Sequence, residues 1–450
     1  MIMKRSLKYG LIFIGAILVV FLALIALVAA TFNPNDYKPL IVNLVQEKKQ
    51  RTLKLEGDIK LTFFPRIGAD FGKISLSEHG SNKEFAAIAS ARVSLAVLPL
   101  LKKQLVVDRI QIDGIRARLV RYPDGSTNID DLLKKDESEQ FKFDIEGVSV
   151  TRAALSFDDR MAGRKLDISG MEFESGRLAN NQPGKIGLKF TLQGDNPKID
   201  VQVALASGLL FDTEAKALTL DALTVSLSGK RGVDGLDIRL TSPKFELGPE
   251  RFVGGVDLTA KLIQPPKGNL DLVLSVPALT GKGRAVRADN FTLDIIGQQG
   301  DNTIKSRVAS PFSANLDTRQ FSLDKLVASL KLSSPAMPRA LNMNLGGAAR
   351  LDFARQDAHL DLSGKLDGSP LKARLGMSNF GAPAYSFDIA IDRLDVDRYL
   401  PPGKPENKVK RPEKPLDFGF LKNLNVSGQF SIAALKVANI KSSNIKLKVQ

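Results

Sequence analysis

The segment Leu236-Asp-Ile238-Arg-Leu240 decides the fold class, because apolar and charged residues alternate in it one by one. A period of two puts apolar side chains on one face of a β-strand and charged side chains on the other. The same alternation recurs along most of the chain after residue 52. Further apolar positions that follow it include Leu53, Leu55, Ile59 and Leu61, Val93, Leu95 and Val97, Ile110 and Ile112, Val201, Val203 and Leu205, Phe291, Leu293 and Ile295, and Ile445, Leu447 and Val449. The sequence therefore predicts a mainly β protein.

Turn-forming residues separate the alternating runs. Examples are Pro123-Asp-Gly125, Asn181-Gln-Pro-Gly184 and Gln264-Pro-Pro-Lys-Gly268. Short strands between such turns predict an antiparallel meander of many strands. Two architectures satisfy this pattern: a long, curved sheet whose apolar face lines a groove, and a sandwich in which two apolar faces bury one another. The pattern alone does not choose between them.

The first thirty residues predict a membrane anchor. Lys4, Arg5 and Lys8 precede an uncharged run from Leu11 to Ala30. About twenty helical residues at ~1.5 Å each cross a ~30 Å hydrocarbon core, whereas a secretory signal has an apolar run of only ~7–15 residues. Val28-Ala-Ala30 is the alternative, a cleavage site. The positive charges favour a cytoplasmic N-terminus, so a single-pass protein with an exported body is expected.

A short helix and a linker interrupt the β pattern. Leu40, Ile41, Leu44 and Val45 share one helical face, and Asn35 or Asp36 is the expected N-cap. Residues 400–415 are rich in proline and charge, which is typical of a disordered linker. The expected organisation is a cytoplasmic N-terminus (1–10), an anchor (11–30), a helix and β region (31–135), a β-groove body (136–399), the linker (400–415), and the start of a further β block, cut short of its natural end (416–450).

Composition narrows the functional classes. Lysine and arginine number 64 against 49 acidic residues, a formal net charge of +15. These charges are scattered along strand-like segments, so they favour solvated strand faces, with attraction to anionic lipid headgroups as the alternative. Basic residues are not interleaved with aromatic ones, which argues against a nucleic-acid partner. The chain has no cysteine, which excludes disulfides and thiolate chemistry.

No catalytic or metal-binding pattern is present. The only two histidines, His79 and His359, are far apart in the sequence, so a zinc site or a Ser-His-Asp triad is not expected. Asp392, Asp395 and Asp397 are the densest carboxylate cluster; a weak Ca²⁺ site is conceivable there, but Arg393 and Arg398 favour an ion-paired strand. We therefore predict a protein without enzymatic activity, metal or cofactor.

The N-terminal third resembles the opening of the AsmA family. The motifs that carry the resemblance occur in order after the anchor: Phe32-Asn-Pro-Asn-Asp-Tyr-Lys-Pro39, Glu47-Lys-Lys-Gln-Arg-Thr-Leu53, Glu56-Gly-Asp-Ile59, Phe63-Phe-Pro65, Ile74-Ser-Leu-Ser77, Val107-Asp-Arg-Ile110, Asp124-Gly-Ser-Thr-Asn128 and Asp130-Asp-Leu-Leu133. A looser match is Asp395-Val-Asp-Arg-Tyr-Leu-Pro401. One departure is Gln50, where the family usually has glycine. A left-handed residue other than glycine costs ~1 kcal/mol, so a different helix end is expected.

The resemblance implies a function. AsmA-like proteins are anchored in the inner membrane of bacteria with two membranes, and they resemble bridge-like lipid transfer proteins with a curved, apolar-lined groove. The implied protein is periplasmic, moves phospholipids between inner and outer membrane and has outer-membrane assembly proteins as further partners. The rival is an anchored scaffold that influences outer-membrane protein assembly. The groove candidates are Leu53, Leu55, Ile59, Leu61, Val93, Leu95, Val97, Ile110 and Ile112.

Overall fold

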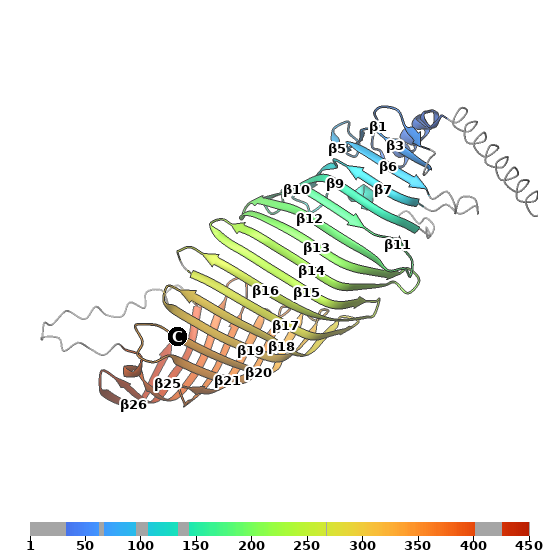
Figure 1. Cartoon of the computed structure of the whole chain (residues 1–450). Coiled ribbons are helices and arrows are strands. Elements are labelled where there is room, and N and C mark those ends of the chain that lie inside the picture. The colour runs from blue at the N-terminus through green and yellow to red at the C-terminus, as the bar shows by residue number, and fades with distance from the viewer. Residues whose placement is uncertain are drawn as a thin grey trace, which may run out of the picture. The chain divides into compact units, whose positions relative to one another are not determined.

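The structure is a computed structural model that describes residues 33–62, 67–95, 107–133, 144–266, 268–400 and 425–449. Strands make up most of these residues, which confirms the prediction of a mainly β protein (Figure 1). The chain forms two compact units, Met1–Leu205 and Ala206–Gln450, which we term unit 1 and unit 2. No helix within the described ranges is both long and apolar enough to cross a membrane. The predicted anchor and all but the first residue of the predicted linker lie outside those ranges.

Unit 1 begins with two helices. η1 (Pro34–Tyr37) is capped by Asn33, whose side chain accepts a hydrogen bond from the Asn35 amide at 3.1 Å, and α2 (Lys38–Lys49) follows directly. α2 ends at Gln50 with φ 52° and ψ 37°, so the expectation of a different helix end is wrong. The Gln50 amide donates to the Gln46 carbonyl at 3.0 Å, and the Gln50 carbonyl accepts from the Gly80 amide at 2.8 Å. These bonds satisfy the helix end and offset the cost of the left-handed conformation.

The first strands of unit 1 come in pairs, and each pair is one long strand with a bend in the middle. The pairs are β1 (Leu53–Leu55) with β2 (Lys60–Thr62), β3 (Ile67–Phe71) with β4 (Ile74–Ser77), β5 (Glu84–Ile88) with β6 (Ser90–Leu95), and β7 (Val107–Asp113) with β8 (Arg116–Arg121). Neighbouring pairs are antiparallel in both halves. At the bend, a Cβ on Gly114 (φ 67°) would lie 2.7 Å from the Ala89 Cβ, so glycine permits the close approach.

The rest of unit 1 continues from this bent sheet. A short helix, α4 (Asp130–Leu133), precedes β9 (Asp144–Asp159), which lies parallel to β7 along its first half and to β8 along its second half. The following strands are β10 (Arg164–Ser175), β11 (Leu178–Ala179), β12 (Gly184–Asp195) and β13 (Lys198–Asp212), the last of which contains the boundary with unit 2. β10 pairs antiparallel with both β9 and β12.

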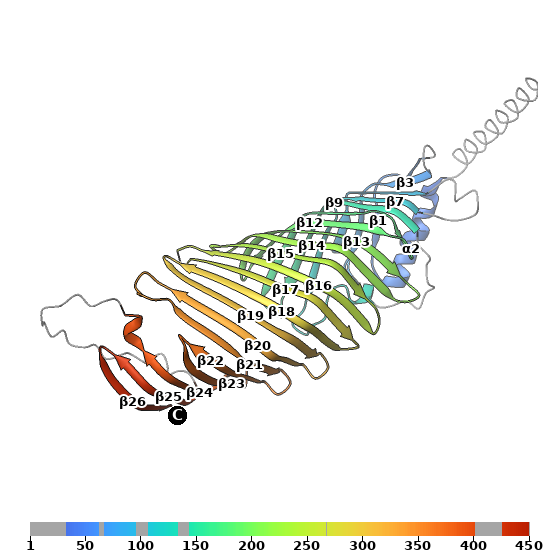
Figure 2. The same ribbon diagram turned by 60° about the horizontal axis from the view of Figure 1, so that its bottom comes forward.

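Unit 2 is a long meander. Its strands are β14 (Ala217–Arg231), β15 (Asp234–Leu247), β16 (Arg251–Gln264), β17 (Gly268–Lys282), β18 (Ala285–Gln299), β19 (Asn302–Asn315), β20 (Gln320–Ser333), β21 (Leu341–Asp352), β22 (Asp357–Leu366), β23 (Ser369–Ser378) and β24 (Ala384–Asp395). Each pairs antiparallel with the next. After η2 (Val396–Arg398), β25 (Asn425–Val437) joins β24, and β26 (Ile440–Val449) closes the series. Figure 2 shows these strands side by side in a curved sheet.

The prediction of a purely antiparallel sheet needs two corrections. β9 is parallel to β7 and β8, and β25 is parallel to β24. Both joints follow long connections, residues 122–143 and 396–424, rather than tight hairpin turns. Parallel neighbours require a connection of a dozen or more residues, so these two long segments are what permits the change of direction.

A line of bulges crosses the middle of the unit 2 sheet. The strand register shifts between Thr241 and Phe245, Gly254 and Val256, Ala288 and Phe291, Ala309 and Ser313, and Leu323 and Leu326. Two serines in this line are almost fully buried, Ser242 (1% exposed) and Ser310 (2%), and their hydroxyls donate to the Lys244 and Pro311 carbonyls. Bulges bend the strands that contain them. This line therefore runs where the long strands of the sheet bend.

Candidate functional site

One face of the unit 1 sheet collects the predicted groove residues. Leu61 pairs with Ala69, Ala69 with Val93, Val93 with Ile110, and Ile110 with Val148. These residues lie opposite one another on five adjacent strands, so their side chains lie on the same face. In the next row on that face, Ile112 lies between Ala91 and Val150.

Leu53 and Leu55 lie on the same face, although they belong to the other half of the bent strands. Leu53 pairs with Leu76 and Leu55 with Ile74. Strand β12 runs past both halves, and its alternation is uninterrupted. Leu188 of β12 pairs with Phe173 in one half of β10, and Leu192 pairs with Ile168 in the other half. The bulge in β10 therefore keeps the apolar side chains of both halves on one face.

The remaining candidates are placed differently. Ile59 lies between β1 and β2 and is buried, 7% exposed, with its amide donating to the Asn35 side chain at 2.9 Å. The backbone of Leu95 pairs with Ile67, and its side chain is outside the described part of the structure. Val97 lies entirely outside the described ranges. Leu53, Leu55, Leu61, Val93, Ile110 and Ile112 are all partly exposed.

Unit 2 has an apolar face of its own. One row across β19 to β24 is Ala314, Phe321, Leu351, Ala358, Met377 and Tyr385, and the next row is Leu323, Ala349, Leu360, Leu375 and Phe387. The bulges maintain this face across β18 and β20, where the alternation changes phase. In β20, for example, Phe321 and Leu323 are followed by Leu326 and Ala328 on the same side.

Part of this face packs together and part of it is open. Leu366, Leu371, Ala373 and Ile391, on β22, β23 and β24, form a buried cluster. Toward the turns that follow β21 and β23, the same face forms a concavity of about 700 Å³ with an almost wholly apolar lining, which includes Leu351, Leu360, Leu375, Met377 and Tyr385. Leu375 and Tyr385 are each 37% exposed. An apolar surface of this kind is typical of a binding site for an apolar ligand.

Four phenylalanines form a ladder beside this concavity, and the sequence reasoning missed them. Their ring centroids are 6.3 Å apart for Phe312 and Phe321, 5.6 Å for Phe321 and Phe353, and 5.7 Å for Phe353 and Phe380. These are favourable aromatic contact distances. Each ring lies near a hairpin turn, so the recurrence of phenylalanine close to successive turns was the available signal.

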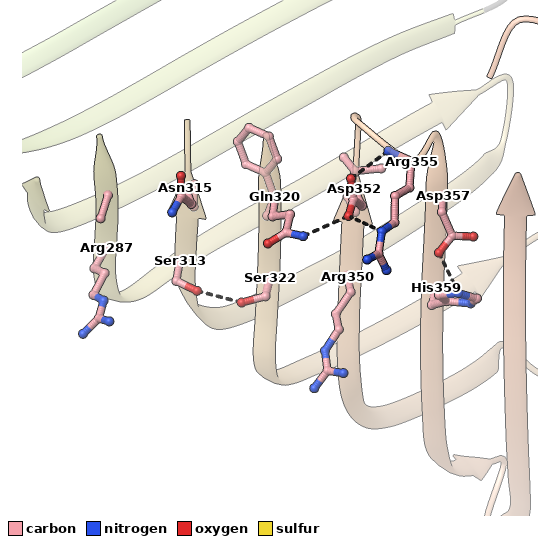
Figure 3. Close-up of a pocket in the computed structure, with 14 residues that line it drawn as sticks. Arg287, Ser313, Asn315, Gln320, Ser322, Arg350, Asp352, Arg355, Asp357 and His359 are labelled. Carbon is pink, nitrogen blue, oxygen red and sulfur yellow. Dashed lines mark hydrogen bonds and ion pairs between the residues drawn. The ribbon is translucent and has the colours of Figure 1, made fainter. Parts of the chain in front are cut away.

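The opposite face of the same strands is polar. Figure 3 shows a row of polar side chains on adjacent strands, and the register orders it as Arg287, Ser313, Ser322, Arg350 and His359. The two serine hydroxyls are 2.7 Å apart, and His359 Nε2 lies 2.8 Å from Asp357. These residues line a concavity of about 480 Å³. The two faces of this part of unit 2 therefore differ sharply in polarity.

Comparison with known proteins supports the resemblance seen in the sequence. The family model described as the AsmA family matches residues 3–209. This match supports the assignment of residues 3–209 to the AsmA family. Protein AsmA of Escherichia coli strain K12 is 28% identical over 149 residues, which cover 31% of this chain and 24% of that protein. The match thus spans about a quarter of the relative's length. No solved structure matches the chain.

The AsmA-family motifs meet around a buried arginine. The Arg51 side chain is 0% exposed, and its guanidinium donates to both carboxylate oxygens of Asp131 at 2.7 and 2.6 Å. It also donates to the carbonyls of Ser77 at 2.8 Å and Asn128 at 2.6 Å, and it lies 4.9 Å from the centre of the Phe85 ring. The hydrogen bonds from Arg51 hold the pKa of Asp131 below its usual value.

Asn128 extends this network. Its side-chain oxygen accepts from the Val120 amide at 2.9 Å, and its side-chain nitrogen donates to the Arg118 carbonyl at 2.8 Å and to Glu78 at 3.1 Å. The motifs around residues 51, 77 and 128 are therefore structural: they hold the end of α2 and residues 127–131 against the sheet. His79 belongs here too, with Nδ1 3.0 Å from the Lys49 carbonyl and 3.6 Å from Asp131.

The C-terminal carboxylates act separately. Asp392 pairs with Arg393 at 3.3 Å, whereas Asp397 accepts hydrogen bonds from the Ala438 and Asn439 amides and pairs with Lys436 at 3.4 Å. Among the described residues no group of acidic or histidine side chains is arranged to hold a metal ion. Burial, followed by a hydrogen bond to Asp367, raises the pKa of the neighbouring Tyr399 to about 12. The contacts of Asp397 fasten the β25–β26 hairpin to the end of β24.

Proposed function

We propose that this protein is an inner-membrane-anchored periplasmic protein whose apolar sheet face holds the acyl chains of phospholipids and passes them between the inner and outer membranes. The observation that carries the proposal is the exposure of large apolar side chains on one face. Leu375 and Tyr385 are 37% exposed, Phe353 is 47% exposed and Leu447 is 58% exposed. A sandwich would bury such side chains against a second sheet, whereas a trough leaves them open to a ligand.

Energetics support a protein-lined path for lipids. A two-chain phospholipid has about thirty methylenes, and exposing each to water costs ~0.8 kcal/mol, more than 20 kcal/mol in total. Passage across an aqueous compartment without a protein is therefore slow. An apolar face that crosses many strands offers the chains continuous shelter, and a polar outer face remains solvated. AsmA-family membership supports a role in the cell envelope, although the family match ends at residue 209.

The proposal is tested by photocrosslinking in living cells, with the full chain. p-Benzoylphenylalanine replaces Leu375 on the apolar face or, as a matched control, Val327 on the opposite face, which is itself apolar and 63% exposed. Crosslinked phospholipid at position 375 and not at position 327 is the expected result. Equal crosslinking at the two positions, or none at position 375, contradicts the proposal. A protein partner crosslinked at 375 in place of lipid supports the rival assembly scaffold.

A second test separates the trough from a sealed core. Leu375→Asp places a carboxylate on the apolar face, where its present exposure lets it reach water once lipid has left. We expect a folded protein that has lost bound phospholipid and no longer supports lipid traffic, while Leu375→Met keeps both. Unfolding of Leu375→Asp would instead show that the face is a dry core, because an unpaired buried carboxylate costs several kcal/mol.

A further inference from the structure

Helix α2 carries an exposed apolar stripe that the sheet does not use. Leu40 is 65% exposed, Ile41 39% and Leu44 49%. Positions i, i+1 and i+4 lie on one side of a helix. Tyr37, at the N-terminal end of the same side, is 50% exposed. A contiguous apolar patch on a water-facing body marks a surface that meets a partner.

The opposite arc of α2 already has a function. Val42 and Val45 are less exposed than the stripe and lie on the side of Lys38, whose ammonium donates to the Gly57 carbonyl and lies 3.9 Å from Asp58. The Gln50 carbonyl, at the other end, accepts from the Gly80 amide. Both ends of α2 are thus fastened to unit 1, so the rest of unit 1 fixes the direction in which the stripe points.

We infer that this stripe lies in the surface of the bilayer that holds the predicted anchor. The inference rests on the anchored topology of the proposed function. Seven residue steps separate Ala30, the end of the predicted span, from Tyr37, and an extended chain covers at most ~3.6 Å per step, so the stripe begins within about 25 Å of the bilayer.

The side chains around the stripe suit a lipid surface. Leu40, Ile41 and Leu44 enter the boundary between headgroups and acyl chains, and a tyrosine at the edge is typical of that depth. Lys48 continues the same side one turn after Leu44, and its long stem lets the ammonium reach lipid phosphates. Asn43 and Gln46 lie on the remaining arc, between the stripe and the arc that packs on unit 1, and they face water.

Docking in this way fixes where the apolar sheet face begins. β1 and β2 follow α2 directly, and they carry Leu53, Leu55 and Leu61 on the apolar face of unit 1. A helix held flat on the bilayer therefore sets these first strands beside the membrane. The stripe orients the entry of the lipid path as well as holding the protein to the surface.

The absence of cysteine makes a direct test simple. Leu44→Cys on the stripe and Asn43→Cys on the water-facing arc are each labelled with the fluorophore NBD. The full chain is reconstituted in vesicles of phosphatidylethanolamine and phosphatidylglycerol, and flotation confirms that it is anchored. At position 44 we expect the NBD emission to be blue-shifted and to lose at least half of its intensity when the lipids carry a nitroxide near the headgroup. Position 43 is expected to show neither.

The outcomes are distinguishable. If the chain floats but position 44 behaves like position 43, the stripe does not meet the bilayer and the inference is wrong, while the anchor stands. If position 44 is blue-shifted without nitroxide quenching, a protein surface covers the stripe, which also overturns the inference. If the chain does not float, the anchored topology itself fails and the inference falls with it.

Discussion

Loss of the Asp131 carboxylate tests the buried ion pair of unit 1 most sharply. In Asp131→Asn the Arg51 guanidinium keeps its bonds to two carbonyls but has no counter-charge, and its side chain is 0% exposed. Breaking a buried pair by removing one partner costs about 3–5 kcal/mol, because a charge is left without compensation away from water. For a unit of this size, about 2–4 °C per kcal/mol gives a fall in Tm of roughly 6–20 °C.

The pH dependence provides an independent check. The pKa of Asp131 is lower in the folded protein than its ordinary value of 3.8, so the pair stabilises the fold above that pH, and this contribution is lost as the pH falls through the folded pKa. The difference in Tm between the wild type and Asp131→Asn should therefore be full near pH 7 and shrink below about pH 4.

The assay is thermal unfolding of the full chain, with hydrogen exchange to locate the effect around residues 51 and 128. Asp130→Asn is the matched control, since Asp130 is the neighbouring aspartate and its carboxylate accepts hydrogen bonds from Thr127, three residues away. The double variant Arg51→Met, Asp131→Leu should be much less destabilised than the sum of its single changes. An Asp131→Asn protein with the same melting temperature as the Asp130→Asn control would refute the reasoning.

Three further changes probe other parts of the fold. Gly347→Ala should destabilise unit 2 by about 1–3 kcal/mol, because its new Cβ would lie 1.9 Å from a backbone carbonyl oxygen. At Gly346 the nearest atom to a new Cβ is 3.6 Å away, so Gly346→Ala should have little effect on stability, and thermal unfolding of the two variants tests the difference. Asp397→Asn should raise hydrogen exchange in residues 425–449 while leaving β14 to β23 protected, and unchanged exchange there would contradict its proposed clamp on the last hairpin. Gln50→Gly should raise stability by up to ~1 kcal/mol, since glycine adopts the left-handed helix end without strain; a lower melting temperature would show that the glutamine side chain matters more than the backbone.

Sequence alone determined the local structure of this protein. Alternation such as Leu236-Asp-Ile-Arg-Leu240 is a property of consecutive residues, so it predicted strands and their apolar faces correctly without knowledge of any partner strand. The same local reasoning predicted a helix that contains Leu40 to Val45, which α2 confirms, but the expected N-cap was wrong: Asn35 and Asp36 lie within η1, and Tyr37 is the N-cap of α2. It also grouped Leu61, Val93 and Ile110, which the strand register brings onto one face.

Tertiary structure decided the features that depend on residues far apart in the chain. Arg51 and Asp131 are 80 positions apart, and nothing in the local pattern of either predicts a buried pair. The bulge line is a similar case: each phase change in alternation looks like an irregularity of one strand until the register aligns it with its neighbours. Both parallel joints depend on where a long connection returns to the sheet. Local pattern determines which way a side chain points, whereas only the pairing of distant strands determines which side chains meet.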